Sequence, residues 1–216
     1  MSKASDYVVV DDSRVDVLVI GVSTGGPHAL MDLLPRFPAD FPVPILIVQH
    51  MPPVFTKFLA ERLAGCCKMP VAEGRAHQTL ASGGVWIAPG DFHMAIERKG
   101  DAVRIRTHRE PHENSCRPAA DVLFRSAAEV YGAHVLAVVM TGMGHDGFKG
   151  CEHIRAAGGQ VLVQDEASSV VWGMPGFIVK AGMADQVLPL GALGPEIIER
   201  VSRHRQRQPA LVGADR

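Results

Sequence analysis

The sequence of 216 residues lacks the long apolar segments that membrane proteins carry. No apolar run approaches the ~20 residues that a helix needs to cross a bilayer. Residues 1–6 also show none of the apolar character of a secretory signal peptide. We therefore expect a cytoplasmic protein that does not insert into a membrane.

Cysteine is scarce, and neither sign of charge predominates. The four cysteines form no C-x-x-C pair and no regular spacing, which predicts free thiols rather than a disulfide framework or a zinc site. Lys and Arg number 22 against 23 Asp and Glu, and the net charge of −1 disfavours nucleic acid or an anionic membrane as the partner. Hydrophobic residues at 47% and charged residues at 21% are typical of a soluble globular enzyme.

Most of the chain is expected to form one domain, because 216 residues is an ordinary length for a single domain. The polar residues 1–15 are predicted to be a flexible arm. Residues 16–202 form the expected catalytic domain, and the basic, then featureless, residues 203–216 form the expected disordered tail.

A serine follows the first apolar run of that domain. Val17–Ile20 has the continuous apolar character of a buried parallel strand, and Gly21-Val22-Ser23-Thr24-Gly25 follows it directly. This pentapeptide fits the G-x-S-x-G elbow, in which a sharp strand-to-helix turn exposes a serine hydroxyl. Pro27 suits the first turn of the helix that would follow.

Apolar runs and helical patterns alternate along the rest of the chain. This order predicts a three-layer α/β/α fold with a doubly wound, mostly parallel sheet. Between residues 69 and 106 the runs are short and broken by glycine, so we expect antiparallel hairpins there, including Val85–Ala88. The strands expected in the parallel sheet include residues 17–20, 45–48, 135–140 and 160–163.

Ser23, His50 and Asp146 each fall just beyond the carboxyl end of a different predicted strand. Because parallel strands end at the same edge of a sheet, we expect the three side chains to lie together. They could supply the nucleophile, the base and the orienting acid of a serine hydrolase. A histidine base with an ordinary pKa would make activity rise over roughly pH 6–7.5.

Two other patterns allow different interpretations. Gly142–Gly147 satisfies G-x-G-x-x-G and is followed by Asp165 after the next strand, as in a dinucleotide-binding protein. His108, His112 and Cys116 recur every four residues, which would place metal ligands on one face of a helix. Pro111 interrupts such a helix, so no metal site is predicted.

Several motifs together resemble the family of chemotaxis protein-glutamate methylesterases (CheB). They occur in order over about residues 17–200. The motifs are Gly21–Gly26, Val48–Pro52, Ala88–Met94, Arg117-Pro118, Asp121–Phe124, Thr141–Gly147, Gln164–Glu166 and Gly173–Pro175.

The resemblance implies hydrolysis of γ-glutamyl methyl esters on the cytoplasmic helices of chemoreceptors, and in some members deamidation of receptor glutamines. It implies no cofactor and no metal. Ser23 would be the nucleophile, His50 the base and Asp146 its orienting acid. The resemblance also places the oxyanion beside the backbone of Thr24 and Met143. Arg117 would lie near the substrate groove.

Two departures from the family pattern stand out. Cys116-Arg117-Pro118-Ala119 replaces the usual His/Ser-Arg-Pro-Ser, so substrate contacts are expected to differ. We also expect no phosphorylatable receiver domain before Val17, which leaves a separate receiver or signalling protein as a candidate partner. A non-catalytic or retargeted relative that only binds a signalling partner stays open as an alternative function.

Overall fold

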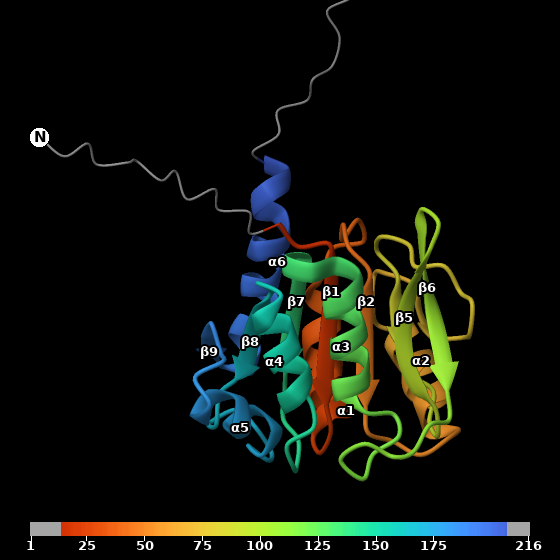
Figure 1. Ribbon diagram of the computed structural model, residues 1–216. Helices are drawn as coiled ribbons and strands as arrows, with labels where there is room; N and C mark the ends of the chain where they lie inside the picture. The colour runs from red at the N-terminus through yellow and green to blue at the C-terminus, as the bar shows by residue number, and fades with distance from the viewer. Residues whose placement is uncertain (1–13, 207–216) are drawn as a thin grey trace, which may run out of the picture.

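The computed structural model describes residues 14–206 and contains one seven-stranded sheet in which every strand pair is parallel (Figure 1). The strand order is β3-β4-β2-β1-β7-β8-β9. The strands are β1 (Val17–Val22), β2 (Ile45–Gln49), β3 (Val71–Glu73), β4 (Val85–Ile87), β7 (Val135–Val139), β8 (Gln160–Gln164) and β9 (Gln186–Leu188).

Helices cover both faces of this sheet. They are α1 (Gly26–Leu33), α2 (Phe55–Ala64), α3 (Ala120–Tyr131), α4 (Phe148–Ala156), α5 (Met174–Lys180) and α6 (Leu190–Gln206). Two short 3-10 helices, η1 (Leu34–Arg36) and η2 (Gly132–His134), precede strands. No helix in the described part of the chain is both long and apolar enough to cross a membrane.

Alternate side chains of β1 divide the core into two clusters. Leu18 and Ile20 pack in the cluster that contains residues of α1, α2 and α6. Val17 and Val19 pack in the cluster that contains residues of α3, α4 and α5. A strand that is buried on both faces must be apolar at every position, which explains its uninterrupted apolar run. The prediction of a three-layer α/β/α fold is confirmed.

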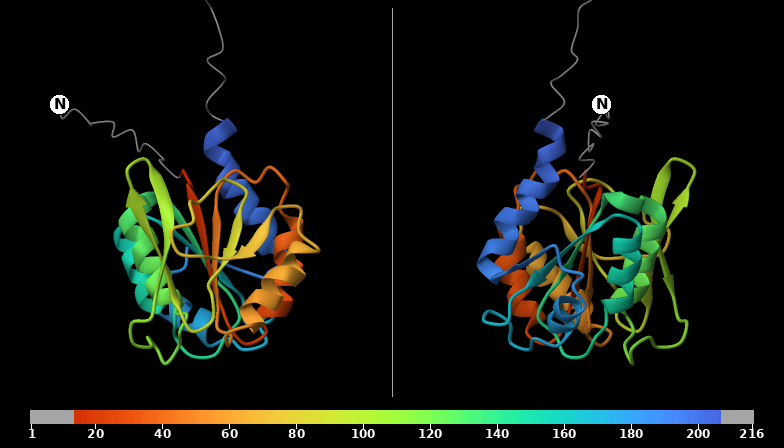
Figure 2. Two further views of the ribbon diagram at one scale, coloured as in Figure 1. Left: turned by 90° about the vertical axis from the view of Figure 1, so that its right-hand side faces the viewer. Right: turned by 60° about the vertical axis from the view of Figure 1, so that its left-hand side comes forward.

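One antiparallel pair lies outside the main sheet. Strands β5 (His93–Lys99) and β6 (Ala102–His108) form a hairpin that packs over α3 on one flank of the molecule (Figure 2). The prediction of an antiparallel hairpin is therefore confirmed for these two strands.

The prediction was wrong for Val85–Ala88, because β4 pairs in parallel with both β2 and β3. All three side chains of β4 are buried, which is the pattern of an interior parallel strand rather than of a hairpin with one solvated face.

The carboxyl ends of the parallel strands define one edge of the sheet, which we call the carboxyl edge. Strand β1 lies between β2 and β7, so three adjacent strands end there side by side. The start of β1 and the end of α6 lie at the opposite edge (Figures 1 and 2). Helix α6 extends to Gln206, four residues into the segment predicted to be a disordered tail. Residues 1–13 of the predicted arm (1–15) and the rest of the tail lie outside the described residues, whereas Val15 is buried in the core.

Candidate active site

The loop after β1 holds Ser23 at the carboxyl edge. Its backbone N–H donates to Thr141 O over 3.0 Å, which ties this loop to the one after β7. Gly25 has a φ of 83°, in the left-handed region that favours glycine, and it turns the chain into α1. The side chain of Ser23 is half-buried at this turn.

A buried amide connects the Ser23 loop to the His50 loop. Gln49, at the end of β2, is 2% exposed, and its Nε2 donates to Ser23 O over 3.0 Å and to His50 O over 3.1 Å. A Cβ at Gly26 would lie 1.9 Å from Gln49 Oε1, so only glycine fits there. One side chain therefore sets the spacing between the two loops.

His50 and Asp146 form a short hydrogen bond. His50 Nε2 lies 2.6 Å from Asp146 Oδ2, although 96 residues separate them in the chain. Asp146 is 2% exposed and also accepts from the backbone N–H groups of Ala120, over 2.6 Å, and Asp121, over 3.1 Å. These N–H groups belong to the first turn of α3, whose unpaired donors favour a negative charge. The convergence expected from the sequence is present for this pair.

The pKa values of His50 and Asp146 are shifted in opposite directions. Burial alone would lower the pKa of His50, but the hydrogen bond and charge of Asp146, with a contribution from Cys116, raise it to about 9. Burial alone would raise the pKa of Asp146, but His50 and the helix N–H groups hold it below its usual value. An ion pair between imidazolium and carboxylate is thus favoured at neutral pH. The raised pKa of His50 lies above the ordinary histidine value on which the expected activity window of pH 6–7.5 is based.

Cys116 contacts the other nitrogen of the same ring. Its Sγ lies 3.6 Å from His50 Nδ1. Nδ1 is the nitrogen that remains available to take a proton when Nε2 donates to Asp146. Sequence reasoning missed this contact, and the only signal for it was the departure from the family pattern at position 116.

The His108, His112 and Cys116 pattern does not gather metal ligands. Cys116 contacts His50, whereas His108 packs against His93 with ring centroids 5.3 Å apart. Within residues 14–206 no three His, Cys, Asp or Glu side chains are placed to hold a metal ion.

Thr24 follows Ser23 in the loop after β1, and Met143 lies in the loop after β7. Thr24 O accepts from Thr141 Oγ1 over 2.9 Å, and the Met143 side chain is 70% exposed. Among the described residues, the backbone N–H groups of Thr24 and Met143 donate to no other backbone group.

The guanidinium of Arg117 contacts other residues of this chain. It is 16% exposed, and it forms an ion pair with Asp91 Oδ1 at 2.5 Å. It also donates to the carbonyls of Arg109, over 3.3 Å, and Glu110, over 3.1 Å. These contacts brace the loop between β6 and α3, which carries Cys116 to His50.

The glycine-rich loop Gly142–Gly147 makes contacts within the protein that a dinucleotide site does not require. Gly142 O accepts from the N–H groups of Gly173 and Met174, and the same loop delivers Asp146 to His50. Asp165 Oδ1 accepts from the backbone N–H and hydroxyl of Ser168, over 3.0 and 2.6 Å. These contacts account for the motif without a bound nucleotide.

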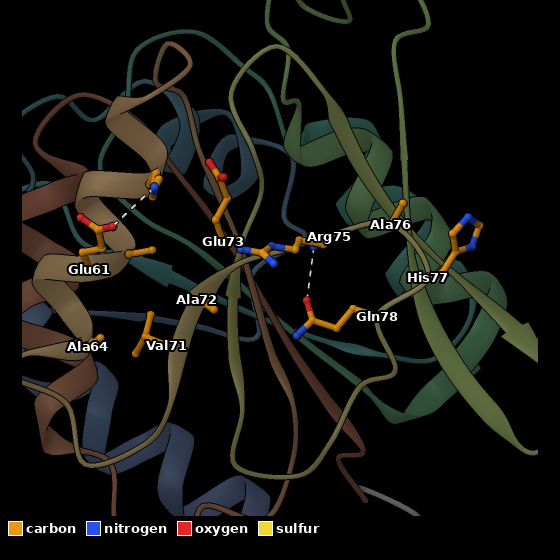
Figure 3. Close-up of a pocket in the computed structure, with 11 residues that line it drawn as sticks. Glu61, Ala64, Val71, Ala72, Glu73, Arg75, Ala76, His77 and Gln78 are labelled. Atoms are coloured by element: carbon orange, nitrogen blue, oxygen red, sulfur yellow. Dashed lines mark hydrogen bonds and ion pairs between the residues drawn. The ribbon is translucent and has the colours of Figure 1, made fainter.

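A cavity of about 660 Å³ lies between α2 and β3, away from these residues (Figure 3). Lys57 and Glu61 of α2 line one wall, and Glu73, Arg75 and Gln78 line the other. Ser23, His50 and Asp146 do not line it. The candidate site is therefore the open carboxyl edge and not this cavity.

Comparisons with known proteins agree with this fold. Residues 18–197 match the family model described as CheB methylesterase. A protein-glutamate methylesterase/protein-glutamine glutaminase of Trichodesmium erythraeum is 60% identical over 188 residues, which are 87% of this chain and 53% of that protein. The protein of the same name from Nocardioides sp. is 52% identical over 198 residues, 92% of this chain and 53% of that protein.

The crystal structure of the Thermotoga maritima CheB methylesterase catalytic domain superposes with a TM-score of 0.84 at 41% identity, covering 86% of this chain and 98% of that domain. The chain spans about half the length of the curated relatives that it matches. From the family model, these identities and this superposition, we conclude that the chain belongs to the CheB methylesterase family.

Proposed function

We propose that this chain is a serine esterase that hydrolyses γ-glutamyl methyl esters on the cytoplasmic helices of chemoreceptors. The observation that carries the proposal is the hydrogen bond of 2.6 Å between His50 and Asp146, beside a serine on a glycine turn. Catalysis of ester hydrolysis by serine needs a base for the hydroxyl proton and a buried acceptor that orients this base.

In the acylation step, Ser23 Oγ attacks the ester carbonyl and its proton passes to His50 Nδ1. Asp146 keeps the opposite nitrogen protonated and stabilises the imidazolium that forms. The N–H groups of Thr24 and Met143 receive the negative oxygen of the tetrahedral intermediate. Methanol leaves with the proton from His50, and water then cleaves the acyl-serine by the reverse sequence of proton transfers.

Cys116 Sγ occupies the neighbourhood of Nδ1, the nitrogen that must accept the serine proton. Ser23 Oγ must therefore approach Nδ1 beside this thiol when substrate binds. Hydrogen bonds of a catalytic site commonly tighten only in the substrate complex. Arg117 acts in this scheme by bracing the loop of Cys116 beside the substrate groove.

The surroundings of the site favour a protein substrate. Large apolar side chains are exposed on both sides of the Ser23 and His50 loops, and apolar surface of this kind is typical of interaction sites. They are Val54, Phe55 and Phe58 near His50, and Met143, Val170 and Phe177 on the other side, each 49–70% exposed. An amphipathic receptor helix could cover these residues while it presents a modified glutamate to Ser23.

Deamidation of receptor glutamine is a second candidate activity. The printed names of the relatives pair methylesterase with glutaminase. A glutamine carboxamide would form the same acyl-serine and release ammonia instead of methanol. A chain that only binds a receptor or a separate receiver protein would release neither product.

The test is methanol release from membranes that carry methylated chemoreceptors. The parent chain should release methanol, Ser23→Ala should not, and Ser82→Ala, at an exposed serine remote from the carboxyl edge, should match the parent. Equal release by the parent and Ser23→Ala would refute the serine mechanism. No release by a folded parent chain would favour the binding-only alternative.

A further inference from the structure

Asn114 lies between two buried carboxylates. Its Nδ2 is 2.8 Å from Asp146 Oδ1 and 2.7 Å from Asp121 Oδ2. Asp121 is fully buried, and its other oxygen accepts from the backbone N–H of Gly150 over 2.6 Å. Both neighbours of the Asn114 amide are acceptors, so its nitrogen must face them and give one proton to each.

From these contacts we propose that Asn114 is a positioning residue for the proposed esterase reaction: its amide holds the Asp146 carboxylate in the orientation that pairs with His50 and separates it from Asp121. The inference rests on the proposed function for its catalytic consequence. The contact itself involves Oδ1 of Asp146, while His50 uses Oδ2. The amide and the imidazole thus fix the two oxygens of one carboxylate.

Few other residues could take this place. The backbone of Asn114 has a φ of 52°, a conformation that asparagine and glycine adopt more readily than other residues. The two carboxylates need two protons from a single short side chain. Serine offers one proton, ionised aspartate offers none, and glutamine is longer by one methylene.

The electrostatic surroundings explain why this separation matters. Asp146 faces His50, Asp121 and Glu113, and His50 faces Asp146 and Cys116. Burial raises the pKa of Asp121, and the nearby charge of Asp146 raises it further, whereas Gly150 and Asn114 oppose the rise. Without the amide, repulsion between the carboxylates would be relieved by rotation of Asp146 or by proton uptake at Asp121.

The test compares Asn114→Gly and Asn114→Asp with Ser115→Gly. Asn114→Gly keeps the left-handed backbone and removes the amide, and Asn114→Asp keeps the shape and removes the donor. Ser115 is exposed on the same loop, has a φ of 63° and contacts neither carboxylate, so it is the matched control. Asn114→Ser, with one donor, supplies a milder variant if either change impairs folding.

The first readout is the titration of the His50 ring by NMR in a Ser23→Ala background, which needs no turnover. Rotation of Asp146 away from His50 would weaken the hydrogen bond that raises the pKa of His50, so in Asn114→Gly this pKa should fall from about 9 by about half a unit or more. The fall should be absent in Ser115→Gly. An unchanged His50 titration in folded Asn114→Gly and Asn114→Asp would overturn the inference.

The second readout is turnover with Ser23 present. We expect kcat to fall about 10- to 100-fold in Asn114→Gly, the size of a lost hydrogen bond to a charged group, with little change in KM. A purely structural role would lower kcat without moving its pH midpoint, and that result would also overturn the inference. If the parent released no methanol but the NMR shift appeared, the proposed function would fail while the positioning of Asp146 would stand.

Discussion

Two pairs of largely buried side chains each contain a histidine, but only the pair His50–Asp146 includes a carboxylate within hydrogen-bond distance. The pair His93–His108 has no such carboxylate. His50 has Asp146 2.6 Å away, and the pKa of His50 rises to about 9. His93 and His108 face each other across β5 and β6, and neither nitrogen of His108 has a hydrogen-bond partner in the described structure. The Glu110 carboxylate lies 3.6 Å from His108 Nδ1, too far for a hydrogen bond.

The His108 pKa shifts in the opposite direction. Burial lowers it most, the charge of Glu110 opposes this shift, and the smaller effects of Arg106 and His93 lower it further. Burial therefore favours neutral imidazole in both places, and the buried carboxylate, with a smaller contribution from Cys116, reverses the effect at His50. A histidine that serves as a base needs this partner, whereas a packing histidine does not.

The largest expected effect comes from removing each histidine in turn. His50→Gln should lower kcat by about 10⁴- to 10⁶-fold, because no other group accepts the serine proton. His108→Gln should leave kcat within about threefold, since it has no role in the proposed chemistry. Methanol release and thermal unfolding of both variants provide the measurement. Comparable losses of kcat in two folded variants would contradict the distinction between the pairs.

Asp146→Asn should make His50 resemble His108. The asparagine keeps the size of the side chain but removes its charge, so burial should bring the pKa of His50 down from about 9 to below 6.5. We expect kcat to fall about 10⁴-fold, because the wrong tautomer becomes available. NMR titration of His50 in this variant measures the first effect. A His50 pKa that stays near 9 would assign the shift to another group.

The pH profile of the parent follows from the same pair. If proton transfer limits turnover and His50 must be neutral, activity should increase roughly tenfold between pH 7.5 and pH 9. A plateau already reached at pH 7 would contradict the raised pKa.

Stability should change in the opposite sense. The folded-state pKa of His50 lies above its ordinary value of 6.5, so the pair stabilises the fold fully below about pH 6.5 and loses this effect as pH rises through about 9. Thermal unfolding of the parent over this range should show a decline that His50→Gln lacks.

The smallest expected effect concerns Cys116. Cys116→Ala removes the weaker of the two contributions that raise the pKa of His50, so this pKa should fall by less than in Asp146→Asn. Activity at pH 7.5 should therefore increase by about two- to fivefold. Cys66→Ala, at an exposed thiol away from His50, is the control. A decrease in activity specific to Cys116→Ala would indicate that the thiol contacts substrate.

The sequence predicted the strands that position the site better than it predicted the loops around the site. Uninterrupted apolar runs such as Val17–Ile20 mark strands that are buried on both faces, and this pattern was sufficient for the parallel sheet. Strand ends then placed His50 and Asp146 at one edge. The catalytic roles of Ser23, His50 and Asp146 stay predictions, as do the roles assigned to Thr24, Met143 and Arg117.

Features that depend on long-range contacts were not predictable. Short β4 showed the glycine signals of a hairpin, and only its pairing with β2 and β3 reveals an interior strand. Asn114 and Cys116 lie in an irregular loop whose course depends on Arg117 and Asp91. No periodicity marks such residues, because their partners are 32 and 66 residues away in the chain.

The placement of both described chain ends opposite the carboxyl edge has a practical consequence. The start of β1 and the end of α6 lie on the side of the sheet opposite the carboxyl edge (Figure 1). A fluorophore or surface tether attached just before β1 or at the end of α6 would leave the carboxyl edge facing the solution. If the proposed function holds, chains immobilised at either place should capture receptor-bearing nanodiscs, which would allow single-molecule and biosensor measurements of docking without redesigning the loops of the site.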